Sequence, residues 1–348
     1  MLELDGGHGE GGGQILRTAL SCSMITGKPF RIHQIRANRA KPGLQPQHLS
    51  ALRAAGSLST AQINGDKLGS ESATFQPKAV RAGRLTVNTG TAASTTLIAQ
   101  TILLPLLLLN DASEVTLTGG THNPVSPCFE FLVSVFLTSI GLPQDRVALT
   151  MIEPGFYPAG GGQLRLDVAP GRLRIVNWTQ TNQVLRLEAA AYAQVGVSES
   201  DVHAWLAPLR EAAGDLPYSL TIRRAAREGF ALPAVVLRCV GTSRDDVLSE
   251  CQTRDANPHS VVISVARQLQ LKLRDKCPVG AHLQDQLLLP MAVAGGGTYV
   301  TGALTSHWHT QVDTLSLFFP QLEITAQRID AGHLVKVKDH ASSTSART

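Results

Sequence analysis

Apolar side chains recur at helical spacing along much of the chain, and short apolar runs typical of strands lie between these segments. Over residues 14–26 they stand at positions 15, 16, 19, 20 and 24, which gather on one face of a helix. The proline at position 105 predicts a kink in a long apolar helix. The pattern predicts helices over residues 14–26, 47–60, 94–109, 127–140, 198–213 and 260–274. It predicts strands over residues 30–35, 74–77, 84–87, 115–118, 146–152, 163–168, 172–177, 184–191, 219–223 and 234–240.

Glycine is concentrated in four clusters, each beside an apolar segment. The clusters are DGGHGEGGGQ at 5–14, GGTHNP at 119–124, FYPAGGGQ at 156–163 and AVAGGGT at 292–298. Glycine is common where a chain turns tightly between elements. The clusters therefore predict a repeated βα unit whose turns carry glycine, and an α/β fold class.

The character of the chain changes between about residues 185 and 274. The glycine clusters stop, charged residues become more frequent, and the expected elements run strand, helix, strand, strand, helix, with Ser200 as the N-cap of the first helix. The earlier pattern resumes at Val279. We therefore expect a small α/β domain at 181–275, inserted into a large domain made of 1–180 and 276–340. The polar residues 341–348 are expected to be a disordered tail.

Composition narrows the class of protein. A hydrophobic content of 43% and a charged content of 17% exclude an intrinsically disordered chain. The net charge of +4 excludes a histone-like polycation but permits a local basic groove for a polyanion. Five dispersed cysteines without a CxxC pair argue against a disulfide framework or a structural zinc site, and favour reduced thiols in the cytoplasm. Residues 1–10 lack the features of a secretory signal. The apolar run 98–109 is shorter than the roughly 20 residues of a spanning helix, so no membrane association is expected.

The first glycine cluster can bind an anion. Consecutive glycines let backbone N–H groups approach closely, and the helix behind them presents its positive end. Glu10 in the loop can hold a cation, and Arg17 follows on the first turns of the helix. A tight strand–helix turn with a solvated carboxylate is the alternative, and the spacing matches neither a P-loop nor a dinucleotide-binding fingerprint.

A second candidate segment is basic. Arg36, Arg39 and Lys41 lie within six residues, and Gln47 and His48 follow them. Arginine binds phosphate through paired hydrogen bonds, so this loop suits a polyphosphate or a nucleic-acid end. Solvated surface charge is the alternative. No aromatic residues accompany the loop, so broad binding of single strands by stacking is not expected.

Two further segments carry polar residues beside apolar ones. Asp285 and Gln286 precede a strongly apolar helix, where they would line a pocket or, in the case of Asp285, cap the helix. In SHWHT, His307 and His309 alternate with Trp308. On a strand both imidazoles would face one side, as in a metal-binding pair. The other interpretations are a histidine nucleophile that attacks a phosphoryl centre and ordinary structural histidines.

Six of these segments together resemble the RNA 3′-terminal phosphate cyclase family. They follow the family's order from Leu4 to Thr310, and the small domain matches mainly by position and length. The segments are LDGGHGEGGGQILRTAL, IRANRAKPGLQPQHL, GGTHNP, GFYPAGGG, VGAHLQDQLLLPMA and SHWHT. Each is short, but six in order make a specific match. The resemblance implies a large catalytic domain of three repeated βαβαββ-like units, with a smaller α/β domain inserted in the third.

The resemblance also implies an activity. Family members use ATP and a divalent cation, Mg²⁺ or Mn²⁺. A histidine attacks the α-phosphorus and forms a covalent histidine–AMP intermediate with release of pyrophosphate. AMP then passes to an RNA with a 3′-terminal phosphate, and the neighbouring 2′-OH attacks to give a 2′,3′-cyclic phosphate. This chemistry accords with a glycine loop that receives anions, a basic loop and an accessible histidine.

Roles for individual residues follow from the same resemblance. The family pattern H-x-x-T-N places the nucleophile at His307, with Gln311 in place of the usual asparagine and His309 as the fallback. Glu10 matches the metal-binding carboxylate. The implied ATP contacts are Gln14, Arg17, Gln100, His282, Leu283, Gln284, Asp285 and Gln286. The implied contacts with the nucleotide or the RNA end are Arg36, Arg39, Gln47 and His48.

Two other functions stay open at this point. The family has a non-catalytic branch that binds during ribosome assembly and lacks the nucleophile, and His307 argues against that branch. The pair His307 and His309 also permits a metal-dependent hydrolase. A homodimer is compatible with the sequence, which does not settle the oligomeric state.

Overall fold

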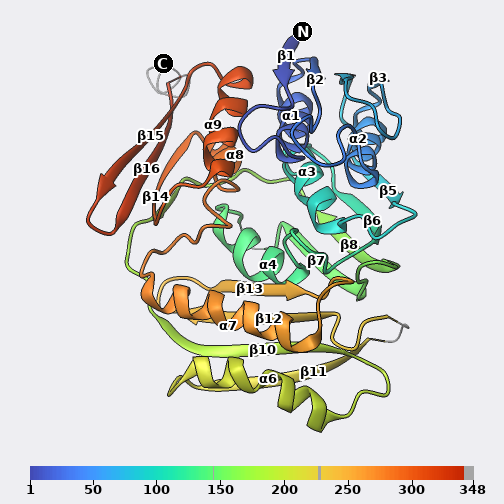
Figure 1. The fold of residues 1–348 in the computed structure, drawn as a ribbon. Helices are drawn as coiled ribbons and strands as arrows, with labels where there is room; N and C mark the ends of the chain where they lie inside the picture. The colour runs from blue at the N-terminus through green and yellow to red at the C-terminus, as the bar shows by residue number, and fades with distance from the viewer. Residues whose placement is uncertain (144, 226–228, 341–348) are drawn as a thin grey trace.

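The computed structural model describes residues 1–143, 145–225 and 229–340, so the tail at 341–348 lies outside the described residues. Within them the strands form four sheets of four strands each, with helices packed between and over them (Figure 1). The α/β class predicted from the sequence is confirmed. No helix in these ranges is long and apolar enough to cross a membrane.

Three of the sheets share one strand order. In each, the first two strands are parallel and the fourth strand lies between the second and the third. The first sheet contains β1 (Leu2–Asp5), β2 (Phe30–His33), β3 (Gln62–Asn64) and β4 (Ala73–Gln76). The second contains β5 (Gly83–Asn88), β6 (Ser113–Gly119), β7 (Val147–Glu153) and β8 (Gly162–Val168). The third contains β9 (Val176–Trp178), β14 (Gly296–Thr301), β15 (Leu322–Ile329) and β16 (Gly332–Asp339). The chain therefore repeats one unit three times, but the four glycine clusters do not mark equivalent turns of it. They lie after β1, after β6, before β8 and before β14.

The helices of these three units fill the space between the sheets. The first unit has α1 (Gln14–Thr26) and α2 (Pro46–Ser59). The second has α3 (Thr95–Leu107), α4 (Phe129–Phe131), the π-helix η1 (Leu132–Phe136) and α5 (Leu137–Ser139). The third has α8 (Leu288–Ala294) and α9 (Ser306–Phe318). Helices α1 and α9 pack closely together, which brings the first and third units into contact.

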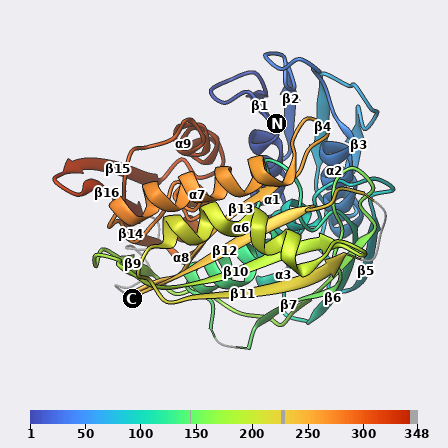
Figure 2. The same ribbon diagram turned by 60° about the horizontal axis from the view of Figure 1, so that its bottom comes forward.

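The fourth sheet is inserted between β9 and β14, the first two strands of the third unit. Its order, β11-β10-β12-β13, differs from that of the other three sheets. Its elements are β10 (Val184–Gln194), α6 (Glu199–Ala213), β11 (Tyr218–Ala225), β12 (Ala234–Gly241), β13 (Asp246–Cys251) and α7 (Pro258–Arg274). Helices α6 and α7 lie side by side over this sheet (Figure 2). The domain limits at residues 181 and 275 stay predictions.

Local sequence explains where the main helices begin and end. Helix α1 ends at Gly27, whose φ of 71° suits glycine, and it covers the predicted range. Helix α3 begins after Ser94, whose hydroxyl accepts a hydrogen bond from the Leu97 backbone N–H at 3.3 Å. Pro105 lies two residues before the last residue of α3, so its missing N–H affects only the final turn of the helix. Helix α6 is capped by Ser198, which accepts from the Asp201 N–H at 3.1 Å, so the prediction of Ser200 as its N-cap is wrong.

Two predicted elements differ from the structure. The helix predicted over 127–140 forms in three parts, because a π-helical turn at η1 interrupts the α-helical hydrogen bonds. The strand predicted over 172–177 is a strand only from Val176 to Trp178. The backbone N–H groups of Gly171 and Arg174 instead donate to the carbonyls of Leu107, the last residue of α3, and of Gly141.

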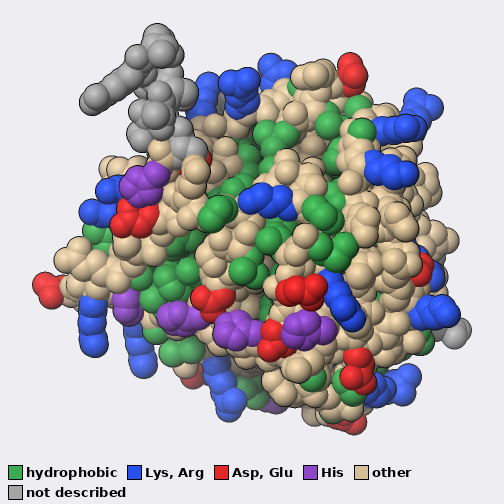
Figure 3. Space-filling model, turned by 90° about the horizontal axis from the view of Figure 1, so that it is seen from above, with side chains coloured by type: hydrophobic (Ala, Val, Ile, Leu, Met, Phe, Trp, Pro, Cys, Tyr) green, Lys and Arg blue, Asp and Glu red, His purple; other side chains and the backbone are tan. Residues whose placement is uncertain are grey.

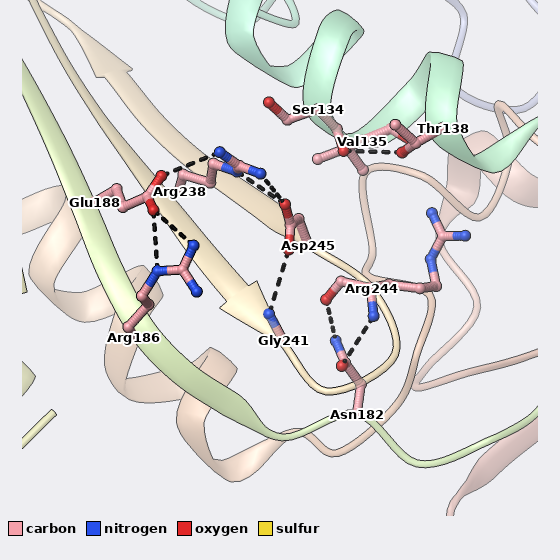
Figure 4. A network of polar contacts seen from close by, with 10 residues as sticks. All are labelled: Ser134, Val135, Thr138, Asn182, Arg186, Glu188, Arg238, Gly241, Arg244 and Asp245. Carbon is pink, nitrogen blue, oxygen red and sulfur yellow. Dashed lines mark hydrogen bonds and ion pairs between the residues drawn. The ribbon is translucent and has the colours of Figure 1, made fainter. Parts of the chain in front are cut away.

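The insertion is anchored to the second and third units. One hydrophobic cluster fills the three units and includes Tyr192 and Val247 of the insertion, and a second cluster fills the insertion itself. Polar contacts run alongside (Figure 4). The Asn182 side chain binds the backbone of Arg244, donating to its carbonyl at 2.9 Å and accepting from its N–H at 3.3 Å. The Arg244 guanidinium stacks on Trp178 at 4.2 Å and donates to the Ser139 hydroxyl.

Candidate functional site

A cavity of about 510 Å³ lies where the three repeated units and the insertion meet. One end is formed by the start of α1 and the start of α9, and the other end by α4, η1 and strand β13 of the insertion. Seven of the residues singled out in the sequence line it, namely Gln14, Arg17, Gln100, His282, Asp285, Gln286 and His307. The cavity therefore brings together polar residues that lie almost 300 positions apart in the chain.

His307 lies in the first turn of α9, one residue after the helix begins. The Thr305 hydroxyl caps the helix by accepting from the Trp308 N–H at 3.2 Å. The metal-binding pair depended on a strand at this segment. The segment is helical instead, and side chains two apart on a helix point in different directions, so the two imidazoles do not form that pair. Trp308 is buried, with its Nε1–H on Tyr299 Oη at 2.8 Å, while both histidines are partly exposed to solvent. Of the two, His307 lines the cavity and His309 does not.

The imidazole of His307 is held by a chain of two hydrogen bonds. His307 Nδ1 lies 2.9 Å from Gln14 Oε1, and Gln14 Nε2 donates to Asp285 Oδ2 at 2.8 Å. Because an amide oxygen can only accept, the network assigns the proton to Nδ1 and leaves the lone pair on Nε2. Asp285 orients Gln14, and Gln14 orients the ring. The arrangement presents Nε2 as a nucleophile.

Burial lowers the pKa of His307 below its usual value of 6.5. Glu10 opposes this shift, while Arg17, Arg39 and His282 add to it because each is cationic or can become so. A lowered pKa keeps the imidazole neutral at pH 7. Only the neutral ring has a lone pair with which to attack an electrophile.

The end of the cavity that contains His307 is also lined by a half-buried carboxyl group, Asp285, and a half-buried guanidinium, Arg17. Burial raises the pKa of Asp285 to about 7, and burial lowers the pKa of Arg17 to about 10. In the described part of the chain, the Arg17 guanidinium makes no hydrogen bond or ion pair. The carboxylates of Glu10 and Asp285 lie close enough to oppose that lowering of its pKa, but neither forms an ion pair with it, so Arg17 is suited to bind an anion that enters the cavity.

The glycine loop before α1 completes this anion-binding end. Gly13 is the N-cap residue of α1, and no side chain caps the helix there, so its first N–H groups are open to a ligand. A side chain at Gly13 would overlap the His48 ring and the Arg17 guanidinium. His48 is thus packed under the loop: its Nδ1 accepts from the Gln45 N–H at 3.2 Å, and burial lowers its pKa to about 3.

Glu10 is placed to hold a cation. Its carboxylate contacts the Arg39 guanidinium through Oε1, while Oε2 is buried without any hydrogen-bond partner. An unpartnered carboxylate oxygen beside an anion-binding cavity fits a divalent cation, since Mg²⁺ is typically held by one or two carboxylates together with phosphate oxygens and water. Among the described residues there is no group of three or more His, Cys, Asp or Glu that could hold a metal ion. The donor set therefore fits an ion shared with a phosphate ligand.

The remaining predicted residues do not line the cavity. Arg36 donates through Nη2 to the Lys41 carbonyl at 3.2 Å and so holds its own loop, and Gln47 is half-buried nearby. Leu283 and Gln284 are buried behind the wall. Gln284 accepts from the Thr305 N–H at 3.2 Å, which ties the loop before α8 to the start of α9. Asp285 precedes α8 but does not cap it, because position 287 is the N-cap residue.

The sequence did not predict which residues line the far end of the cavity. It is lined by Pro127 and Phe131 of the second unit and by Ser249, Glu250 and Cys251 of β13. The change in character at 185–274 suggested a self-contained insertion and gave no sign that one of its strands faces the site. The GGTHNP cluster, which leads into Pro127, was the one available signal.

Comparisons with known proteins agree on one family. The family model described as RNA 3′-terminal phosphate cyclase matches residues 8–324. A protein named RNA 3′-terminal phosphate cyclase from Salmonella enteritidis is 37% identical over 350 residues, covering 97% of this chain and 99% of its own length. Proteins of the same name from Koribacter versatilis and Ralstonia nicotianae are each 36% identical, covering 98% and 97% of this chain and 96% of their own length.

Proposed function

The chain belongs to the RNA 3′-terminal phosphate cyclase family, and on that basis we propose that it converts an RNA 3′-terminal phosphate into a 2′,3′-cyclic phosphate with ATP as co-substrate. The observation that carries the proposal is the hydrogen bond from His307 Nδ1 to Gln14 Oε1, which leaves Nε2 free in the cavity. We propose His307 as the nucleophile of the first step.

In this first step, His307 Nε2 donates its lone pair to the α-phosphorus of ATP. A P–N bond forms, the P–O bond to the β-phosphate breaks, and pyrophosphate leaves with that electron pair. The proton on Nδ1 stays in its hydrogen bond with Gln14, so the ring carries the positive charge of the adenylate. Asp285, which accepts from Gln14, is placed to stabilise that charge.

The surrounding residues bind the polyphosphate. The unpaired Arg17 guanidinium and the open N–H groups at the start of α1 would hold its negative charge. Glu10 would hold Mg²⁺ or Mn²⁺ through its unpartnered Oε2, and the ion would neutralise phosphate charge as it develops. The far end of the cavity, with Phe131 and Pro127, offers an apolar seat for the nucleoside.

Two transfers complete the proposed reaction. An oxygen of the RNA 3′-phosphate attacks the phosphorus of the adenylate, the P–N bond breaks, and His307 regains its lone pair. The 2′-OH of the terminal ribose then attacks the 3′-phosphorus and gives its proton to water. The P–O bond to AMP breaks, AMP leaves with the electron pair, and the cyclic phosphate is closed. Arg39 lies beside Glu10 at the exposed side of the loop, where an RNA end can approach.

The test is incubation with ATP labelled at the α-phosphate, followed by denaturation and detection of label on the protein. We expect the parent protein to carry label that is labile in acid and stable in alkali. We expect His307→Ala to carry no label. His309→Ala is the matched control, because that exposed imidazole lies two residues away and does not line the cavity. Label that survives in His307→Ala and disappears in His309→Ala would reverse the assignment.

Addition of RNA with a 3′-phosphate should discharge the label and produce a cyclic end. A folded parent protein that takes up no label would favour the non-catalytic branch of the family. The hydrolase alternative has lost its geometric basis, because His307 and His309 do not face the same side. A cytoplasmic location and a homodimer stay predictions.

A further inference from the structure

The loop that carries Glu10 is attached to the helix that carries His307 through a buried hydroxyl. The Glu10 backbone N–H donates to Thr310 Oγ1 at 3.0 Å, and Thr310 Oγ1 donates in turn to the Ser306 carbonyl at 2.9 Å. The Thr310 side chain is only 1% exposed. Its hydroxyl therefore acts as donor to α9 and as acceptor for the loop.

The loop is shaped to reach this hydroxyl. Gly9 has a φ of 57°, and a Cβ atom at that position would overlap Thr310 Oγ1. Only glycine combines this backbone conformation with so close an approach. The backbone conformation of the loop therefore depends on glycine at position 9 and allows the close contact with α9.

The Glu10 peptide is held on its other side as well. The Glu10 carbonyl accepts from Arg39 Nη2 at 2.9 Å. Two residues earlier in the loop, His8 Nε2 lies 2.8 Å from the Asp313 carboxylate of α9. The His8 pair is exposed, and histidine and acidic side chains lie next to one another on the face of the molecule seen in Figure 3. An exposed pair contributes little, so the buried Thr310 contact is the main constraint from α9.

We propose that Thr310 is a positioning residue for the metal-dependent step: by fixing the Glu10 backbone to α9, it sets the Glu10 carboxylate at a constant place relative to His307. The inference rests on the proposed function. Thr310 lies one helical turn beyond His307 and does not line the cavity, so it acts through Glu10 and not on the reacting atoms. Residues that orient a metal ligand usually affect metal affinity 10- to 100-fold.

The test measures metal binding directly. Mn²⁺ is titrated into the full-length protein holding α,β-methylene-ATP, which cannot transfer AMP, and bound ion is counted from the loss of the EPR signal of free Mn²⁺. Thr310→Val keeps the shape of the side chain and removes both hydrogen bonds. We expect it to weaken Mn²⁺ binding by about 10- to 100-fold, toward the level of Glu10→Ala. Thr310→Ser keeps the hydroxyl and should restore most of the affinity.

The matched control is Thr314→Val. Thr314 lies one turn further along α9, is also buried, and donates to the Thr310 carbonyl at 2.8 Å. Within the described residues its side chain makes no hydrogen bond to the glycine loop. It should bind Mn²⁺ like the parent. Gly9→Ala disturbs the same contact from the loop side and should weaken binding without a change in α9.

Several outcomes would overturn the inference. They are parent-like Mn²⁺ binding in Thr310→Val, an equal loss in Thr310→Val and Thr314→Val, or a parent protein that binds no more Mn²⁺ than the analogue does alone. Labelling with ATP separates this from the proposed function. If the parent takes up label and Thr310→Val binds Mn²⁺ normally, only the positioning role fails. If the parent takes up no label, the proposed function fails.

Discussion

At the scale of single residues, the site depends on keeping one imidazole neutral and oriented. The tautomer of His307 follows from Gln14, and the direction of Gln14 follows from Asp285. Neither link could be derived from the sequence, because Gln14 lies in the first unit while Asp285 and His307 lie in the third, and no spacing rule connects them. The sequence could show only that each residue stood beside a glycine cluster or an apolar helix.

The charge of Asp285 should make stability depend on pH. Its pKa of about 7 in the folded protein lies above the usual value of 3.8, so between these values the folded state binds a proton that the unfolded state has lost. The stability contribution is complete below about pH 4 and is lost as pH rises through 7. Asp285→Asn cannot ionise. Relative to the parent it should gain stability with rising pH, by at most about 1.4 kcal/mol per pH unit.

Urea unfolding of both proteins without ATP at pH 5, 6, 7 and 8 measures this difference. Asp66→Asn removes an exposed carboxylate and serves as the control for loss of one negative charge. Parallel pH profiles for the parent and Asp285→Asn would contradict the raised pKa. Label uptake from ATP can be measured for the folded parent protein over the same pH values. Adenylate formation should decline as the pH falls below the pKa of His307, because the protonated ring has no lone pair.

At the scale of elements, the sequence predicted the regular amphipathic helices well. It did not predict the structure of a short segment in which polar and apolar residues alternate. Helix α1 has the range that its apolar spacing indicated. The run SHWHT alternates polar and apolar residues as a strand does, but Trp308 is buried because it lies on the inner face of a helix. Thr305 was the missed signal, since a threonine three residues before Trp308 is a typical N-cap.

Arg244 links the start of β13, which lines the cavity's far end, to α5, which directly follows the lining segment η1. It precedes β13, and its guanidinium stacks on Trp178 and binds Ser139 at the end of α5. Arg244→Ala should destabilise the protein by about 2 kcal/mol through loss of the stacking and the buried hydrogen bond. It should also raise the KM for ATP with a smaller effect on kcat, because the wall moves while His307 does not.

Arg244→Lys is the informative partner variant. It keeps the charge but loses the planar stacking, so it should lie between the parent and Arg244→Ala in stability. Urea unfolding, the emission of Trp178 and label uptake at varied ATP concentrations provide the three measurements. A variant that unfolds more easily but keeps the parent's KM would show that Arg244 supports the fold without shaping the cavity.

At the scale of the whole molecule, the glycine clusters suggested repetition, but they lie at non-equivalent turns of the three units and did not reveal the repeated strand order. Three sheets share one strand order, and the insertion interrupts the third unit after its first strand. The loss of glycine clusters and the higher frequency of charged residues between about 185 and 274 were enough to predict the insertion. That it folds back so that β13 closes the cavity could not be predicted, because sheet packing across units depends on surfaces without sequence periodicity.

A ligand that fills the cavity should therefore connect the insertion with the repeated units. We expect α,β-methylene-ATP to slow backbone amide exchange in β13 and α7 as well as in α1 and α9, since all four contribute to the lining. Strand β11 is the internal control, because it lies at the opposite edge of the same sheet from β13. Hydrogen exchange followed by mass spectrometry measures all five elements at once. Protection confined to α1 and α9 would place the ligand outside the far end of the cavity, and equal protection of β11 would indicate general tightening of the insertion.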